Sequence, residues 1–243
     1  MPKQTNSILG TIAGLYLAFS QSNTYAKQQI TPKILVLGDS QYAGVYGHEL
    51  DHLLKQAGNT IKSYGCVSAT AQDYIQGGKH CVLSKKGSTR NSIHKDYILR
   101  PIKYYLTTFA PNAVIISLGG NIQANSNSKK NRTQQISKLV QIVTSQNIKC
   151  IWIGPPGKED PAEKETRDIF YNHLKEGLEN KCTLIDSRDY AIFKKHELHF
   201  KDTQRPKQWA QAIYTKLTRE ILSEIILQMP PKIHLEKPLT KNP

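Results

Sequence analysis

The stretch that decides the fold is Ile34-Leu35-Val36-Leu37-Gly38-Asp39-Ser40-Gln41. An apolar run that stops on a glycine is typical of a buried parallel strand followed by a tight turn into a helix. Such a turn lifts the serine Oγ clear of the sheet, beside the free N–H groups of the helix that follows. Ser40 is therefore a candidate nucleophile for an acyl carbon. In a plainer interpretation, Asp39 and Ser40 only cap that helix.

Short apolar runs and longer segments of helical periodicity alternate along the rest of the chain. This alternation predicts an α/β protein, a three-layer α/β/α sandwich with a five-stranded parallel sheet. Strands are expected at 33–37, 60–64, 113–118, 149–153 and 182–185, and helices at 47–56, 98–109, 134–146, 163–179 and 206–227. Residues 71–96 are expected to form a long surface loop, and residues 229–243 an extended tail rich in Pro and Lys.

The two ends of the chain are expected to lie outside one folded domain at residues 27–228, which suits a length of 243 residues. Residues 1–26 resemble a signal peptide, because Lys3 precedes an apolar stretch and Thr24-Tyr25-Ala26 offers small residues for cleavage. Cleavage is expected after Ala26, with cleavage after Ser20 or an uncleaved anchor as alternatives. The apolar stretch is too short to favour a membrane span. We therefore expect a periplasmic or secreted protein with no stable membrane span in the mature chain.

Cysteine content agrees with export. An even number of four cysteines favours pairing, and of the three connectivities we favour Cys66 with Cys81 and Cys150 with Cys182. The first bridge would tie a loop near Ser40, and the second would join the starts of two neighbouring strands. No zinc site is expected, because no Cys-x-x-Cys or closely spaced Cys/His group occurs.

The chain is strongly basic, with 33 Lys and Arg against 19 Asp and Glu and a net charge of +14. Such a charge favours anionic partners. For an exported protein these are cell-envelope polymers, acidic polysaccharides and lipid head groups. Nucleic acid is not expected, because the basic residues are scattered and carry no interleaved aromatics. A solvated surface with a positive bias explains the charge equally simply.

Two later segments supply further parts of an acyl-transfer site. The apolar run from Val114 to Leu118 ends in Gly119-Gly120-Asn121, where the asparagine amide can donate to a developing oxyanion. His199 precedes the last expected helix by a few residues and can take a proton near neutral pH. Taken singly, Asn121 also suits a left-handed turn and His199 an ordinary surface position.

Together these motifs resemble the SGNH/GDSL hydrolase superfamily over most of the chain. Gly38-Asp39-Ser40 resembles the nucleophile block, Gly119-Gly120-Asn121 the Gly-x-Asn block, and Ile153-Gly154-Pro155-Pro156 is also familiar in these enzymes. The resemblance implies a flavodoxin-like α/β/α fold and serine-dependent ester hydrolysis with no metal or organic cofactor.

The resemblance also implies a role for each matched residue. Ser40 would be the nucleophile and, through its backbone N–H, an oxyanion donor. Asn121 would be a second donor and His199 the general base. The second family block normally places a glycine N–H in the oxyanion hole. The stretch from Gly65 to Thr70 fits it best with Ser68 at the glycine position, and Gly65 is the alternative.

The last block departs from the family pattern. The family usually reads Asp-x-x-His, whereas this chain reads His196-Glu197-Leu198-His199. An imidazole at position 196 cannot replace the carboxylate that orients the base. Either a backbone carbonyl holds His199, or another carboxylate such as Glu197 or Asp202 reaches it, or the activity is weak.

The leading functional hypothesis is an exported serine esterase that removes acyl groups, above all O-acetyl groups, from a cell-envelope carbohydrate such as peptidoglycan or another polysaccharide. Its partner would be an acylated carbohydrate or another small ester. The alternatives are an acetyltransferase of the same fold and a non-catalytic glycan-binding relative of the hydrolases. Tyr42, Tyr46 and Tyr74 suit either sugar contacts or core packing.

Overall fold

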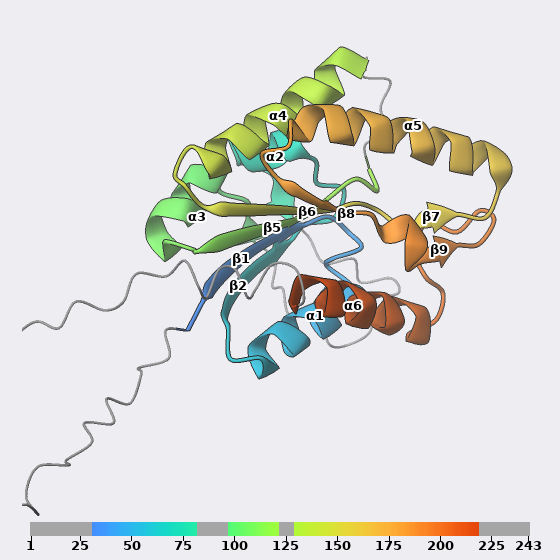
Figure 1. Ribbon diagram of the computed structural model, residues 1–243, viewed down its shortest axis with the longest axis horizontal. Coiled ribbons are helices and arrows are strands. Elements are labelled where there is room, and N and C mark those ends of the chain that lie inside the picture. The colour runs from blue at the N-terminus through green and yellow to red at the C-terminus, as the bar shows by residue number, and fades with distance from the viewer. Residues whose placement is uncertain (1–30, 82–96, 122–128, 219–243) are drawn as a thin grey trace, which may run out of the picture.

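A five-stranded parallel sheet forms the middle layer of the molecule (Figure 1). The structure is a computed structural model that describes residues 31–81, 97–121 and 129–218. The sheet contains β1 (Lys33–Gly38), β2 (Thr60–Gly65), β5 (Ala113–Ser117), β6 (Lys149–Ile153) and β8 (Thr183–Ile185), in the order β2-β1-β5-β6-β8. The direction of strand order reverses between β1 and β5, and ligands of open parallel sheets commonly bind beside the carboxyl ends of strands at such a switch point.

Helices cover both faces of the sheet, as Figure 1 shows. One face carries α1 (Val45–Gln56) and α6 (Gln204–Leu217), and the other carries α2 (Ala71–Gln76), α3 (Ile102–Phe109), α4 (Lys129–Thr144) and α5 (Pro161–Leu178). Ile34 and Val36 belong to the core under α1 and α6, and Leu35 and Leu37 to the core on the opposite face. Because successive strand residues point to opposite faces, a strand buried on both sides must be apolar throughout.

Short elements lie outside the main sheet. Strand β3 (His80–Cys81) pairs antiparallel with β4 (Tyr97–Ile98), and β7 (Gly157–Lys158) pairs in parallel with β9 (Ile192–Phe193). A single 3-10 turn, η1 (Ser187–Asp189), follows β8. None of the described helices is both long and apolar enough to cross a membrane.

The fold class is confirmed, and three local expectations need correction. The expected loop at 71–96 begins with α2 and β3. The helix expected from residue 98 begins at Ile102, because Ile98 pairs with β3 and the residue before Pro101 disfavours helix. Helix α4 begins five residues earlier than expected, at Lys129. The expected signal peptide, the tail and the end of the last helix lie outside the described residues.

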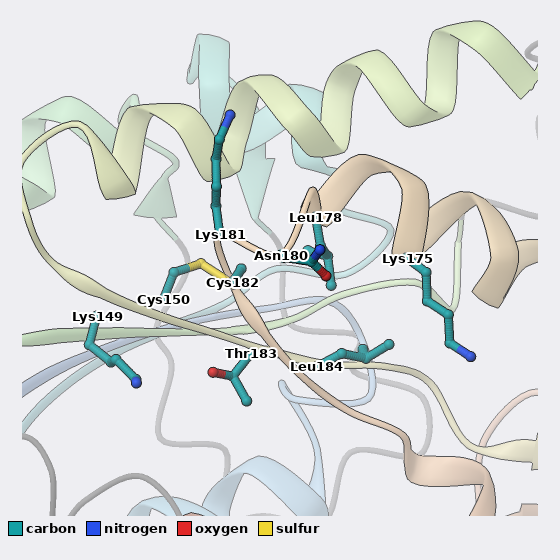
Figure 2. A pocket seen from close by; sticks show the side chains of 9 residues that line it. All are labelled: Lys149, Cys150, Lys175, Leu178, Asn180, Lys181, Cys182, Thr183 and Leu184. Atoms are coloured by element: carbon teal, nitrogen blue, oxygen red, sulfur yellow. A yellow bond between two sulfur atoms is a disulfide. The ribbon is translucent and has the colours of Figure 1, made fainter.

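Both expected disulfides are present. Cys66–Cys81 ties the loop after β2 to β3, and Cys150–Cys182 joins the amino ends of β6 and β8. Figure 2 shows the second bridge in the wall of a pocket of about 390 Å³ that also exposes Lys149, Lys175 and Lys181. This pocket adjoins the amino ends of β6 and β8, so it lies away from the carboxyl ends of the strands, where Ser40 is found.

Candidate active site

Ser40 lies in the turn that connects β1 to α1, at the carboxyl edge of the sheet. The turn is tight, because a Cβ on Gly38 would lie 2.1 Å from the Cβ of Tyr42. Only glycine therefore fits at the end of β1. The Ser40 side chain is half-buried and makes no hydrogen bond to a described residue, so its Oγ is available to a substrate.

Asp39 joins the turn after β1 to the turn after β5, where the strand order reverses. Its carboxylate is buried and accepts hydrogen bonds from the backbone N–H groups of Gln41 at 2.9 Å, Gly119 at 3.3 Å and Gly120 at 3.0 Å. Burial raises the pKa of the Asp39 carboxyl, against the opposing effects of these N–H bonds and the positive charge of Arg167. Asp39 therefore fixes the β1 and β5 turns relative to each other.

The β5 turn places Asn121 beside the loop that follows β2. Gly119 has a φ of +141°, and a Cβ there would lie 2.8 Å from both Phe170 and Pro155, so the turn requires glycine. The Asn121 side-chain amide donates to the Ala69 carbonyl at 3.3 Å. The amide proposed to bind an oxyanion thus lies next to Ser68.

Ser68 adopts the left-handed conformation, with a φ of +59°, which glycine adopts far more readily. This is the conformation expected if Ser68 stands at the glycine position of the second SGNH/GDSL block. The Ser68 carbonyl accepts a hydrogen bond from Lys79 Nζ at 2.8 Å. The alternative, Gly65, is instead the last residue of β2 and is paired in register with Gly38. Ser68 therefore lies in the loop beside Asn121, whereas Gly65 lies within the sheet.

Gln41 connects His199 to the turn that contains Ser40. His199 is exposed and lies in the segment between β9 and α6. Gln41 Nε2 donates to the Leu198 carbonyl at 2.7 Å and lies 3.4 Å from His199 Nδ1. Since Gln41 directly follows Ser40, this contact brings the imidazole to the same rim of the sheet as the serine. The structure contains no hydrogen bond between Ser40 and His199 themselves.

Glu197 holds the His199 segment in place. Its buried carboxylate accepts hydrogen bonds from Arg205 at 2.7 and 2.9 Å and from the backbone N–H groups of Lys194 and Lys201, each at 2.9 Å. The Arg205 hydrogen bonds lower the pKa of Glu197 to about 2. Lys158 Nζ adds a hydrogen bond to the Glu197 carbonyl at 2.8 Å. Glu197 is thus an ionised anchor of its own loop.

Neither of the two carboxylates considered as partners of His199 contacts it. Asp202 pairs with Arg205 Nε at 2.6 Å and accepts the backbone N–H of Arg205 at 2.8 Å, at the start of α6. His196, at the position of the family aspartate, is exposed with a φ of +59°. Among the described residues, the side chain that meets the imidazole is Gln41. Sequence reasoning missed this residue, because 158 positions separate it from His199.

The three tyrosines near the site belong to the core. Tyr42, Tyr46 and Tyr74 are all buried, and the Tyr46 ring stacks on Trp209 at 3.5 Å between centroids. Trp209 Nε1 in turn donates to Ser187 Oγ at 3.0 Å. The ring stack packs α6 against α1, and the hydrogen bond joins α6 to η1. Of the two interpretations open for the tyrosines, core packing is confirmed.

The site consists of an alcohol, an imidazole and an amide, without a cluster of charged ligands. In the part of the chain that the structure describes, no three His, Cys, Asp or Glu side chains gather in a way that would hold a metal ion. The groups present are those of nucleophilic acyl transfer.

The chain shares its fold with solved structures of esterases and of a G-D-S-L family protein. Solved structures of this fold are similar to the chain over their whole length. A carbohydrate acetylesterase, Est24 from Sinorhizobium meliloti, is 17% identical with a TM-score of 0.51, covering 77% of this chain and 99% of its own. An aryl esterase from M. smegmatis is 14% identical with a TM-score of 0.53, covering 77% and 99%.

A protein of the G-D-S-L family from Desulfitobacterium hafniense is 15% identical with a TM-score of 0.54, covering 76% of this chain and 99% of its own. No protein-family model and no curated protein matches the sequence. At these identities the likeness shows the fold alone.

Proposed function

We propose that the protein is an exported serine esterase, in which Ser40 is the nucleophile and His199 the general base. The observation that carries this proposal is the meeting of three distant segments at one rim of the sheet. The Ser40 turn, the Asn121 turn and the His199 segment are joined by the Asp39 carboxylate and the Gln41 amide. Ligands of parallel α/β sheets bind at this place.

The chemistry follows from these groups. Ser40 Oγ attacks the ester carbonyl carbon while His199 takes the hydroxyl proton. The Asn121 amide and the backbone N–H groups of Ser40 and Ser68 donate to the oxygen that becomes negative. His199 then passes the proton to the departing alcohol, which leaves an acyl group on Ser40. Water, deprotonated by His199, attacks this acyl-enzyme and releases the carboxylic acid and the free serine.

For the substrate we propose O-acetyl groups on a cell-envelope carbohydrate. A signal-peptide-like start and two disulfides suit an extracytoplasmic protein, and the charge of +14 favours anionic polymers. Est24, which has the same fold, is described as a carbohydrate acetylesterase. A simple acetyl ester carries the same reacting group, so the first assay uses one.

Hydrolysis of a chromogenic acetyl ester tests the reaction. The purified protein should turn over the ester, and Ser40→Ala should lower kcat by about a thousandfold or more. Ser137→Ala is the matched control, because this partly exposed serine lies on α4, where its hydroxyl donates to Glu179. Turnover that survives Ser40→Ala would show that the serine is not the nucleophile.

The same preparation separates the alternatives. Acetate release from O-acetylated peptidoglycan or polysaccharide supports the proposed substrate, whereas transfer of acetyl to an added sugar hydroxyl indicates an acetyltransferase. Absence of turnover, with equal retention of wild type and Ser40→Ala on the glycan, indicates a binding protein and contradicts the esterase.

A further inference from the structure

The contact between Gln41 and His199 affects where the imidazole carries its hydrogen as well as where the ring lies. The Gln41 amide nitrogen can only donate a hydrogen, whereas an imidazole nitrogen can donate or accept one. The Gln41 side chain spans the gap between the nucleophile turn and the His199 segment. Its amide nitrogen lies 2.7 Å from the Leu198 carbonyl oxygen and 3.4 Å from His199 Nδ1. An amide NH2 has two hydrogens, so one nitrogen can serve both neighbours.

The Leu198 carbonyl fixes which end of the amide faces the imidazole. A flipped side chain would place the Gln41 carbonyl oxygen 2.7 Å from the Leu198 carbonyl oxygen, with no hydrogen between the two acceptors. The amide nitrogen must therefore face Leu198, and the same nitrogen faces Nδ1. This nitrogen is a donor only.

A donor opposite Nδ1 needs a lone pair on Nδ1. In a neutral imidazole that lone pair places the ring hydrogen on Nε2. Since Gln41 occupies the Nδ1 side, the proposed transfer of the serine proton has to go to Nε2, which in this tautomer has no lone pair to receive it. In the serine hydrolases that use a triad, an aspartate accepts the Nδ1 hydrogen and enforces the opposite tautomer.

No described carboxylate counteracts this arrangement. Glu197 and Asp202 are both engaged by Arg205, and no other described side chain makes a hydrogen bond to His199. The distance of 3.4 Å is longer than a regular N–H donor bond, so Gln41 biases the equilibrium between tautomers without abolishing either one.

We propose that Gln41 is a positioning residue that holds His199 mainly as the Nε2–H tautomer, so that the base is fully competent only in the minority of molecules with the hydrogen on Nδ1. This inference rests on the proposed function for the role of His199, but the tautomer itself is a property of the resting protein. A carboxylate at position 41 has no hydrogen for the Leu198 carbonyl, so it would turn from that oxygen towards Nδ1, accept the Nδ1 hydrogen and make Nε2 basic.

The test measures the tautomer and the catalysis separately. In 15N-labelled protein at a pH where His199 is neutral, two-bond 1H–15N spectra distinguish the two ring nitrogens, and His199→Gln assigns the signals. We expect mainly Nε2–H in the wild type, mainly Nδ1–H in Gln41→Glu, and a more even mixture in Gln41→Met, which keeps the size and removes the donor.

The kinetic expectation concerns kcat alone. Gln41→Glu should raise kcat on the chromogenic ester at least about threefold and leave KM within about twofold, because the change acts on proton transfer. Gln211→Glu is the matched control, since it adds the same charge at an exposed position of α6. It should change neither the tautomer nor kcat.

The outcomes separate this inference from the proposed function. A wild-type His199 that is mainly Nδ1–H, or a tautomer that does not change in both Gln41 variants, overturns the role of Gln41, whatever the activity. The expected tautomers together with no turnover in any variant leave the Gln41 contact intact and contradict the esterase. The expected tautomers with kcat unchanged in Gln41→Glu overturn the link between tautomer and catalysis.

Discussion

The two halves of the candidate site are held by different kinds of structure. The nucleophile half consists of buried turns at the ends of β1 and β5, which glycines and the Asp39 carboxylate fix through backbone N–H groups. The imidazole half is an exposed segment whose shape depends on side-chain ion pairs around Arg205. The Ser40 hydroxyl and the proposed oxyanion donors are therefore positioned by the fold itself, whereas the proposed base, His199, is attached to the fold by a few replaceable side chains.

A substitution in the turn after β5, which belongs to the nucleophile half, should lower the free energy of unfolding the most. Gly119→Ala introduces a Cβ 2.8 Å from Phe170 and Pro155 at a φ of +141°, so both crowding and backbone strain oppose it. We expect it to lower the free energy of unfolding by about 4 kcal/mol. Urea unfolding monitored by circular dichroism measures this loss.

Gly58→Ala is the matched control for that change. Gly58 also has a positive φ of +84°, but nothing lies within 4 Å of its would-be Cβ. Its replacement should cost only about 1 kcal/mol of backbone strain. Equal losses at the two positions would show that the β5 turn has room and is not fixed by packing.

Removal of the anchor of the imidazole half comes next. Glu197→Gln leaves Arg205 without its buried partner and should lower the free energy of unfolding by about 3 kcal/mol. Asp202→Asn, which removes the exposed partner of the same arginine, should cost less than about 1 kcal/mol. If the two variants are equally stable, the buried pair does not hold the segment.

Acid should weaken the same ion pair between Glu197 and Arg205. The pKa of Glu197, about 2, is depressed below the ordinary value of a glutamate, so the stabilisation is present above about pH 5 and is lost as the pH falls towards 2. Wild-type protein should therefore lose more stability than Glu197→Gln over that range. Urea unfolding at several pH values compares the two slopes, and parallel slopes would contradict the assignment.

A smaller loss of stability is expected when the contact between β7 and the imidazole half is removed. Lys158 Nζ donates to the Glu197 carbonyl at 2.8 Å and pairs with Glu163 at 3.3 Å. Lys158→Met should lower the free energy of unfolding by about 1 to 2 kcal/mol, and kcat should fall while KM holds, because the loop that carries His199 loosens. Lys164→Met, which removes an exposed pair with Asp168, is the control. Unchanged kcat in Lys158→Met would mean that the segment needs no support from β7.

The smallest loss of stability and of kcat should come from a change at the loop that follows β2 and contains Ser68, which belongs to the nucleophile half. Lys79 Nζ donates to the Ser68 carbonyl at 2.8 Å from a partly exposed position. Because the Cys66–Cys81 bridge also constrains this loop, Lys79→Met should cost about 0.5 to 1 kcal/mol and lower kcat only about threefold. A much larger loss of kcat would show that the bridge does not constrain the loop.

The sequence predicts the nucleophile half well for a physical reason. Apolar runs that end on glycine identify buried strands and the tight turns at their ends, and neighbouring strands brought Cys150 and Cys182 together as expected. Helix α2 was missed although Thr70 and Asp73 form a capping box at its start, because the residues that follow suggested a loop.

The imidazole half was harder to predict, because its contacts join residues far apart in the chain. Nothing local in His196-Glu197-Leu198-His199 indicates that Glu197 turns away towards Arg205 or that Gln41 reaches across to the imidazole. Long-range side-chain contacts in an exposed segment leave no periodic pattern in the sequence. The fold was therefore predictable, and the partner of the base was not.

Covalent capture of the nucleophile tests the central claim most directly. The protein would be treated with a serine-reactive alkyl phosphonate, and the peptide that carries residue 40 analysed by mass spectrometry. We expect one adduct, on Ser40, that is absent from Ser40→Ala and forms about a hundredfold more slowly in His199→Ala. An unlabelled Ser40 in folded protein, or a labelling rate that does not depend on His199, would contradict the account.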